Sequence, residues 1–208
     1  MLRTLFYSII NVLIPPRKHE AVVESLTLES LEALRYNGDL PYHDPTVRAL
    51  VWEIKYRANK KALALAGAIL AEELLGIAEE ELGRLLVVPV PMHKERRRAR
   101  GYNQTELLSE AALSALQSLG NVGSSAFEYS PQALVRTHNT EPQQTLARAK
   151  RLSNVKNSMR ATAPEKIKGR VCIVIDDVST TGATLAEAAR ALKAAGARRV
   201  HTLALARS

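Results

Sequence analysis

Two adjacent carboxylates, Asp176 and Asp177, directly follow a run of apolar, mostly β-branched residues. Small and hydroxyl residues come next: Val178, Ser179, Thr180, Thr181, Gly182, Ala183 and Thr184. Hydroxyl groups and the backbone N–H groups at a helix start bind phosphate, and glycine allows the backbone to approach closely. The carboxylates would then bind the vicinal hydroxyls of a ribose or help to hold Mg²⁺. The segment therefore predicts a ribose phosphate site.

Two other interpretations of this segment are open. An aspartate-capped helix start would need no ligand. The acidic motif of a nucleotide hydrolase would need a G-x-x-x-x-G-K-[ST] phosphate loop, and the sequence contains none. The second interpretation is therefore weakened, and ribose phosphate is favoured over both.

The elements around these residues predict an α/β fold. Residues 171–175 form a short apolar run, as in a strand that is buried on both faces. A helical pattern covers residues 183–195, with Gly196 as its C-cap signal. A strand, a polar loop and a helix in this order place ligand groups at the carboxyl edge of a parallel sheet. Residues 84–90 and 200–206 predict two further strands.

A strongly basic segment follows the strand predicted at residues 84–90. Its basic residues are His93, Lys94, Arg96, Arg97, Arg98 and Arg100. A solvated charged loop is one interpretation of the segment. Because it follows a strand end, a loop that binds pyrophosphate or nucleic acid is the other. Further on, Asn103 and Glu106 resemble a capping box for a helix that ends at Leu119.

The region before that strand predicts two packing helices. Asp44 is a candidate N-cap, and Pro45 stands at the first helical position. Lys55 lies near the end of this helix. It could bind a ligand, but a solvated lysine is the more common outcome on a helix, so solvation is the expectation. The second helix covers residues 60–75 and closes near Gly76.

Composition and length bound the class of protein. With 208 residues, of which 46% are hydrophobic and 24% charged, the chain is typical of one globular domain with extensions. The formal charge of +8 implies an anionic partner, either phosphorylated small molecules or nucleic acid. Cys172 is the single cysteine, which predicts a reduced, cytoplasmic setting without disulfides or a Cys-rich metal site.

The N-terminal segment is apolar but short. Residues 1–14 are too few to span a bilayer, and the Pro-Pro-Arg-Lys sequence at residues 15–18 is not a signal-peptide cleavage site. We expect an amphipathic helix that the prolines end, and no stable membrane insertion.

Residues 174–184 resemble the phosphoribosyl pyrophosphate (PRPP) signature of the type I phosphoribosyltransferases. Residues 89–93 (P-V-P-M-H) and 100–104 (R-G-Y-N-Q) are similar to motifs of the ComF family, whose members are competence-associated phosphoribosyltransferase-like proteins. The resemblance implies the type I phosphoribosyltransferase fold, a mainly parallel sheet flanked by helices, over residues 44–208. Residues 1–43 would form a helical N-terminal extension.

The resemblance also implies roles for individual residues. Asp176 and Asp177 would be catalytic and would contribute to Mg²⁺ binding indirectly, mainly through PRPP. Residues 178–184 would bind the 5′-phosphate. The pyrophosphate-binding residues would be Val90, Pro91, Met92, His93, Lys94 and Arg96. The mobile region between the two phosphate loops would contribute Arg136, His138, Thr140 and Gln143.

The activity that the resemblance implies is phosphoribosyl transfer. The enzyme would bind PRPP and Mg²⁺, transfer the phosphoribosyl group to an unidentified, nucleobase-like small-molecule acceptor, and release pyrophosphate. The alternative is a catalytically weak PRPP-site protein that serves as a nucleic-acid-binding or regulatory component of DNA uptake in competence. Single- or double-stranded DNA and a second copy of the chain, in a homodimer, are therefore open partners.

Most ComF-like proteins are expected to carry an N-terminal cysteine zinc module, and this chain departs from that pattern. Structural zinc needs about four Cys or His ligands. Before residue 89 the chain offers only His19 and His43. We therefore expect no zinc, and either loss of the module or helices in its place.

Overall fold

The central sheet of the protein has five strands in the order β1-β7-β6-β2-β3. A computed structural model describes residues 16–36, 38–118, 124–138 and 155–208. The strands of this sheet are β1 (Leu40–Pro41), β2 (Leu85–Pro89), β3 (Phe127–Tyr129), β6 (Val171–Ser179) and β7 (Arg199–Arg207). Every neighbouring pair runs parallel, which confirms the predicted α/β class and the predicted strands at residues 84–90 and 200–206.

The central strand, β6, is longer than the sequence predicts. The apolar run suggested a strand over residues 171–175 with the acidic pair beyond its end. In the structure β6 continues to Ser179, because β7 is also long and pairs with it from Val171 to Ser179. The two aspartates therefore lie within the strand. The prediction that they follow its end was wrong, because the strand extends four residues further.

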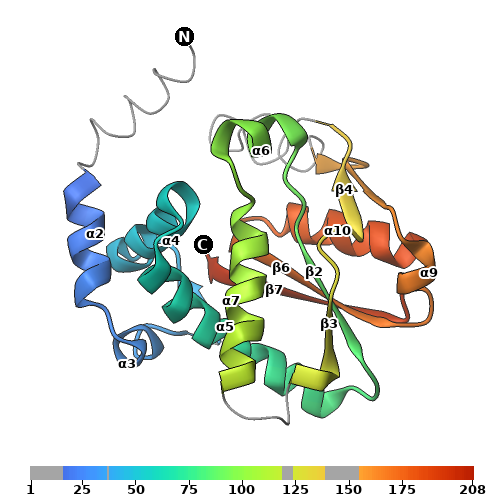
Figure 1. The fold of residues 1–208 in the computed structure, drawn as a ribbon, viewed down its shortest axis with the longest axis horizontal. Helices are drawn as coiled ribbons and strands as arrows, with labels where there is room; N and C mark the ends of the chain where they lie inside the picture. The colour runs from blue at the N-terminus through green and yellow to red at the C-terminus, as the bar shows by residue number, and fades with distance from the viewer. Residues whose placement is uncertain (1–15, 37, 119–123, 139–154) are drawn as a thin grey trace.

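Helices cover both faces of the sheet (Figure 1). The helices on one face are α4 (Pro45–Arg57), α5 (Lys60–Glu80) and α7 (Gln104–Ser118). On the other face lies α10 (Ala183–Ala194), which confirms the helix predicted there. Side chains of a strand alternate between the two faces. Ile173 and Ile175 accordingly join the core under α4, α5 and α7, whereas Cys172 and Val174 join the core under α10.

The first two helices of that group differ in how well the sequence predicts them. Asp44 caps α4 as predicted, because its Oδ1 accepts hydrogen bonds from the N–H groups of Thr46 (2.7 Å) and Val47 (3.3 Å). The end predicted for α5 near Gly76 was wrong, since α5 continues to Glu80. Packing accounts for the extra turn, because Ile77 beyond the glycine still contacts the apolar core.

The basic segment after β2 is a helix rather than a charged loop. Helix α6 (Lys94–Arg100) begins after His93, whose Nδ1 accepts a hydrogen bond from the Glu95 N–H at 3.4 Å. It ends at Gly101, which has a φ of 94° and donates its N–H to the Arg97 carbonyl at 2.8 Å. Only glycine adopts this left-handed conformation without strain, so Gly101 accounts for the helix end.

Two short helices begin the described part of the chain. Helices α2 (Pro16–Ser25) and α3 (Leu28–Glu32) precede β1, and α2 packs against α4 (Figure 1). The helix predicted at residues 1–14 lies outside the described residues. Because β1 pairs with β7, residues before 44 also contribute to the sheet. The division of the chain at residue 44 stays a prediction.

Between α7 and β6 the chain forms smaller elements. They are the 3₁₀ turn η1 (Ser124–Ala126), strands β4 (Leu134–Arg136) and β5 (Met159–Ala161), and the short helix α9 (Pro164–Ile167). Strands β4 and β5 pair antiparallel as a separate two-stranded sheet that packs against α10. Within the described residues, no helix has the length and apolar character needed to cross a membrane.

Candidate functional site

The segment predicted to bind phosphate forms a small pocket between β6 and α10. The pocket is small and open to solvent. Its lining residues are Asp176, Val178, Ser179, Thr180, Thr181, Gly182, Ala183 and Thr184. The structure therefore brings every residue predicted for the 5′-phosphate together with Asp176.

The start of α10 suits this pocket to an anion. Gly182 has a φ of 74° and precedes the helix, so the loop turns in a conformation that favours glycine. The Gly182 carbonyl accepts the first helical hydrogen bond, from the Ala186 N–H at 2.8 Å. The N–H groups of a first helical turn lack acceptors within the helix, and the helix dipole favours negative charge there. Hydroxyl groups, backbone donors and a helix start therefore converge on one pocket.

Asp176 is the carboxylate that borders the pocket. Its side chain is 6% exposed, and its Oδ1 accepts a hydrogen bond from the Asp177 N–H at 2.9 Å. Burial, and then the neighbouring charge of Asp177, raise the pKa of Asp176 to about 8. Asp176 therefore carries a proton at neutral pH when no ligand is bound.

Asp177 is equally buried but has a different environment. Its Oδ1 accepts a hydrogen bond from the Val178 N–H at 2.9 Å. Its Oδ2 lies 2.9 Å from Lys55 Nζ and 3.2 Å from Gln104 Nε2. Burial alone would raise the pKa of Asp177, but the Lys55 ammonium outweighs it and lowers the pKa below its usual value. At neutral pH the two aspartates and Lys55 are together close to neutral.

The prediction that Lys55 is solvated was wrong. Lys55 lies near the end of α4, and its ammonium reaches the carboxyl edge of β6. Burial lowers the pKa of Lys55, but the charge of Asp177 more than compensates, so the pKa is raised. A sequence signal for this position exists, because Lys55 follows the buried Val47 and Val51 at helical spacing. A lysine on a buried helix face needs a partner.

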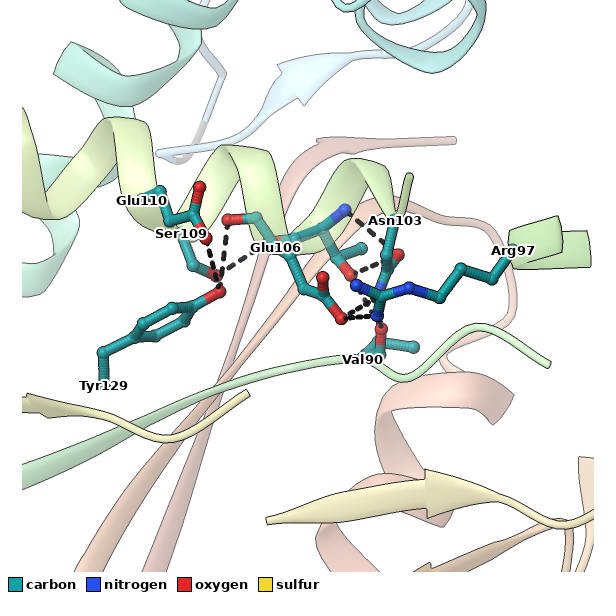
Figure 2. A network of polar contacts seen from close by, with 8 residues as sticks. Val90, Arg97, Asn103, Glu106, Ser109, Glu110 and Tyr129 are labelled. Carbon is teal, nitrogen blue, oxygen red and sulfur yellow. Dashed lines mark hydrogen bonds and ion pairs between the residues drawn. The ribbon is translucent and has the colours of Figure 1, made fainter. Parts of the chain in front are cut away.

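The turn predicted to bind pyrophosphate follows β2, next to the acidic pair. The Val90 N–H donates to the Ile175 carbonyl of β6 at 2.9 Å. The Val90 carbonyl accepts hydrogen bonds from Asn103 Nδ2 (3.1 Å) and Thr105 Oγ1 (2.7 Å) at the start of α7 (Figure 2). The turn is therefore held between β6 and α7.

Asn103 and Glu106 make a different contact from the predicted capping box. The Glu106 side chain accepts hydrogen bonds from Asn103 Nδ2 and pairs with Arg97 of α6 (Figure 2). The Asn103 Oδ1 instead accepts from the Thr105 N–H at 3.4 Å. The basic helix α6 is thereby tied to α7.

The other residues predicted for pyrophosphate divide into two groups. His93 is 7% exposed and caps α6, and Pro91 is buried, so both have structural roles in the turn. Met92 and Arg96 are half-buried, and Lys94 is exposed. These three side chains remain the accessible ones of the set.

Arg136, predicted for the mobile region, connects β4 with the turn that follows β2. It belongs to β4, and its Nε donates to the Pro91 carbonyl at 3.1 Å. Burial lowers the pKa of Arg136, whereas the charge of Asp176 raises it and that of Arg96 lowers it. Burial, and then Arg100, also lower the pKa of Arg96. Crowded cations next to a turn favour binding of a polyanion such as a diphosphate.

Of the remaining predicted residues, His138 lies just beyond β4 and is exposed, and its Nδ1 is 2.9 Å from Thr137 Oγ1. Thr140 and Gln143 lie outside the described residues. Sequence analysis gave no role to Gln104, although it belongs to the R-G-Y-N-Q motif and contacts Asp177. Its place at the first residue of α7, facing β6, became evident only from the fold.

Several known proteins are similar to this chain in sequence. Residues 118–208 match the family described as phosphoribosyl transferase domain. The DNA utilization protein YhgH of Escherichia coli K12 is 32% identical over 168 residues, which cover 79% of this chain and 68% of that protein. Competence protein ComFC of Bacillus subtilis is 35% identical over 159 residues, which cover 76% of this chain and 58% of that protein.

Among solved structures, a hypoxanthine phosphoribosyltransferase from Staphylococcus aureus has a TM-score of 0.39 and 10% identity, over 68% of this chain and 61% of that one. The family match over residues 118–208 includes β6, α10 and the loop between them. The similarity to YhgH covers at least two thirds of both proteins. The chain therefore belongs to the ComF family, within the type I phosphoribosyltransferase superfamily.

Proposed function

We propose that the protein binds PRPP together with Mg²⁺ and is a phosphoribosyltransferase. The observation that carries this proposal is the pocket between β6 and α10, with its hydroxyl lining and with Asp176 at its border. A 5′-phosphate would lie in that pocket and the ribose beside the acidic pair. The pyrophosphate would lie at the turn next to Pro91, where Arg136 and Arg96 contribute positive charge.

In this mechanism the protein positions PRPP and stabilises charge, and it forms no covalent bond to the sugar. The acceptor's nucleophile forms a bond to C1 of the ribose while the bond from C1 to pyrophosphate breaks, and pyrophosphate keeps the electron pair. Asp176 would oppose the positive charge that develops on the sugar once the bound ligand has displaced its proton. Arg96 and Arg136 favour the negative charge of the leaving group.

The residues present fit a metal ion that enters with its ligand. In the part of the chain that the structure describes, no three His, Cys, Asp or Glu side chains converge on one point. Two carboxylates supply fewer oxygens than octahedral Mg²⁺ requires, so diphosphate oxygens and water would complete the set. Bound Mg²⁺ would neutralise part of the negative charge on the leaving group.

The proposal is tested by calorimetric titration with PRPP in the presence of Mg²⁺. We expect the wild type to bind and Asp176→Asn/Asp177→Asn to lose binding, because the ribose loses its carboxylate contacts. Glu79→Gln/Glu80→Gln is the matched control, since it removes two adjacent exposed carboxylates at the far end of α5. Absence of binding by folded wild-type protein, or equal binding by the aspartate variant, would refute the proposal.

A second candidate function is nucleic-acid binding in DNA uptake, which the exposed basic side chains of α6 favour. Lys94, Arg97 and Arg98 are all exposed on this short helix. The names of the relatives, DNA utilization protein and competence protein, support the same alternative. Both functions can coexist, because these side chains lie outside the phosphate pocket.

Further expectations stay predictions. The acceptor is expected to be nucleobase-like, and a second copy of the chain is a possible partner in a homodimer. A cytoplasmic location is supported by the single cysteine, Cys172, which is buried in β6.

A further inference from the structure

The carboxylate of Asp177 already has partners from three elements. Val178 of β6 donates to Oδ1, while Lys55 of α4 and Gln104 of α7 both contact Oδ2. The side chain of Asp177 is 8% exposed, compared with 27% for Lys55. A buried carboxylate in such an arrangement is compensated both in charge and in hydrogen bonding.

Residues next to both partners make further contacts with neighbouring elements. Lys55 follows the buried Ile54, whose carbonyl accepts a hydrogen bond from Tyr102 Oη at 3.4 Å. Gln104 is oriented by Arg100, whose Nη1 donates to the Gln104 Oε1 at 2.6 Å. The Arg100 guanidinium in turn lies 5.2 Å from the centre of the Tyr56 ring of α4. Gln104 is therefore oriented from α6, and Lys55 and Gln104 meet at the same oxygen of Asp177.

We propose that the Lys55 ammonium serves as a permanent counter-ion of Asp177. It lies where a metal ion would otherwise bind this carboxylate, and so it keeps free divalent cations away from Asp176 and Asp177. Adjacent carboxylates attract a divalent cation, but an ammonium 2.9 Å from Asp177 repels one at close range. A metal ion then enters the site only when a phosphorylated ligand brings oxygen ligands of its own. Lys55 is thus a positioning residue that acts through Asp177.

The inference rests on the proposed function for its biological meaning, but its test uses the metal alone. Mn²⁺ is titrated into ligand-free protein, and the free ion is measured by its electron paramagnetic resonance signal. We expect little binding by the wild type. Lys55→Met removes the charge while keeping an unbranched side chain, and it should raise the affinity for Mn²⁺ by about tenfold or more.

Three further variants isolate the charge. Lys60→Met is the matched control, because it removes an exposed lysine at the start of α5 and should change nothing. Gln104→Met removes a hydrogen bond to Asp177 but no charge, so it should leave Mn²⁺ binding weak. The double variant Lys55→Met/Asp177→Asn should bind Mn²⁺ as weakly as the wild type, because the carboxylate that gives Lys55→Met its higher affinity is removed.

Two results would overturn the proposal: Mn²⁺ binding by the wild type that is as tight as in Lys55→Met, or no increase in that variant. A purely structural role for Lys55 predicts no increase. If Lys55→Met does not fold, Lys55→Gln gives the same comparison, and tight binding by the wild type alone is already decisive. Failure of PRPP to bind leaves these results unchanged, so the two proposals fail separately.

Discussion

Two neighbouring aspartates of equal burial have different tasks because their partners differ. Asp176 borders the phosphate pocket and has a raised pKa, whereas Asp177 is paired with Lys55 and has a lowered one. One acid is therefore protonated and the other ionised at neutral pH. Asp176 is the residue whose charge a ligand can change, and Asp177 supports the electrostatics around it.

The raised pKa of Asp176 makes a prediction about stability. The unfolded chain releases the Asp176 proton near pH 4, while the folded protein keeps it until about pH 8. The folded state therefore holds more protons in this window, and the free energy of unfolding falls as pH rises. Asp176→Asn cannot ionise, so its stability relative to wild type should increase between pH 6 and pH 9, by about 2–3 kcal/mol. Urea unfolding at both pH values measures the difference.

Asp44→Asn is the control for that experiment. Burial opposes ionisation of Asp44, but the N–H groups of Thr46 and Val47 lower its pKa, so it is ionised throughout this pH range. The stability of this variant relative to wild type should not change between pH 6 and pH 9. The same pH independence in Asp176→Asn would show that Asp176 is already ionised at pH 6.

At the scale of elements, α5 and α7 approach closely at Gly67. A Cβ atom added there would lie 2.7 Å from the backbone carbon of Ala111 in α7. Real side chains essentially never come so close, so Gly67→Ala must push the two helices apart. We expect a loss of about 1–3 kcal/mol in the free energy of unfolding, as for an overpacked core. Because Gln104 starts α7, PRPP binding in this variant should weaken as well.

Gly76 in the same helix provides the matched control. It is exposed, and no atom lies within 4 Å of a Cβ added there. Gly76→Ala should therefore stabilise the protein by about 0.5–1 kcal/mol, because alanine loses less backbone entropy in a helix. Thermal and urea unfolding measure both variants. Equal changes in the free energy of unfolding for Gly67→Ala and Gly76→Ala would contradict the idea that close packing of α5 on α7 requires a glycine at position 67.

At the scale of the whole molecule, the basic residues behind the net charge of +8 fall into two groups, and only one of them lies near the proposed ribose phosphate site. Arg96 is half-buried beside Arg100 and is one of the residues proposed to bind pyrophosphate. Lys94, Arg97 and Arg98 are exposed on α6 and are the candidates for contact with DNA phosphates. Lys94 is also one of the residues predicted for pyrophosphate, so the two sites are separated by Arg96 on one side and by Arg97 and Arg98 on the other.

The test is the salt dependence of binding to double-stranded DNA. If α6 binds DNA, changing Lys94, Arg97 and Arg98 to glutamine should weaken binding and reduce the slope of log K against log salt by about 2–3, since each phosphate contact contributes about 0.9. Changing Lys166, Lys168 and Lys193 to glutamine removes the same charge elsewhere on the surface. Equal effects of the two triple variants, or no binding at low salt, would contradict a DNA site on α6.

The sequence by itself determined the fold class and the place of the loop that we propose binds phosphate. Its signals there are local: an apolar run in β6, small hydroxyl residues around Gly182, and a helix start at Ala183. Each depends on neighbours within a few residues, so spacing and residue type are sufficient. The N-cap at Asp44 is predictable for the same reason. The end of α5 is not, because the core contact of Ile77 outweighs the local preference of Gly76.

Only the tertiary structure decided how the acidic pair is balanced. Lys55, Gln104 and Asp177 are separated by long stretches of chain, and they meet because α4 and α7 pack on the same face of β6. Arg136 likewise reaches Pro91 only because β4 lies beside the end of β2. Electrostatic interactions act through space between residues that are distant in the sequence. Their effect on pKa and on ligand binding therefore depends on packing that no local pattern in the sequence encodes.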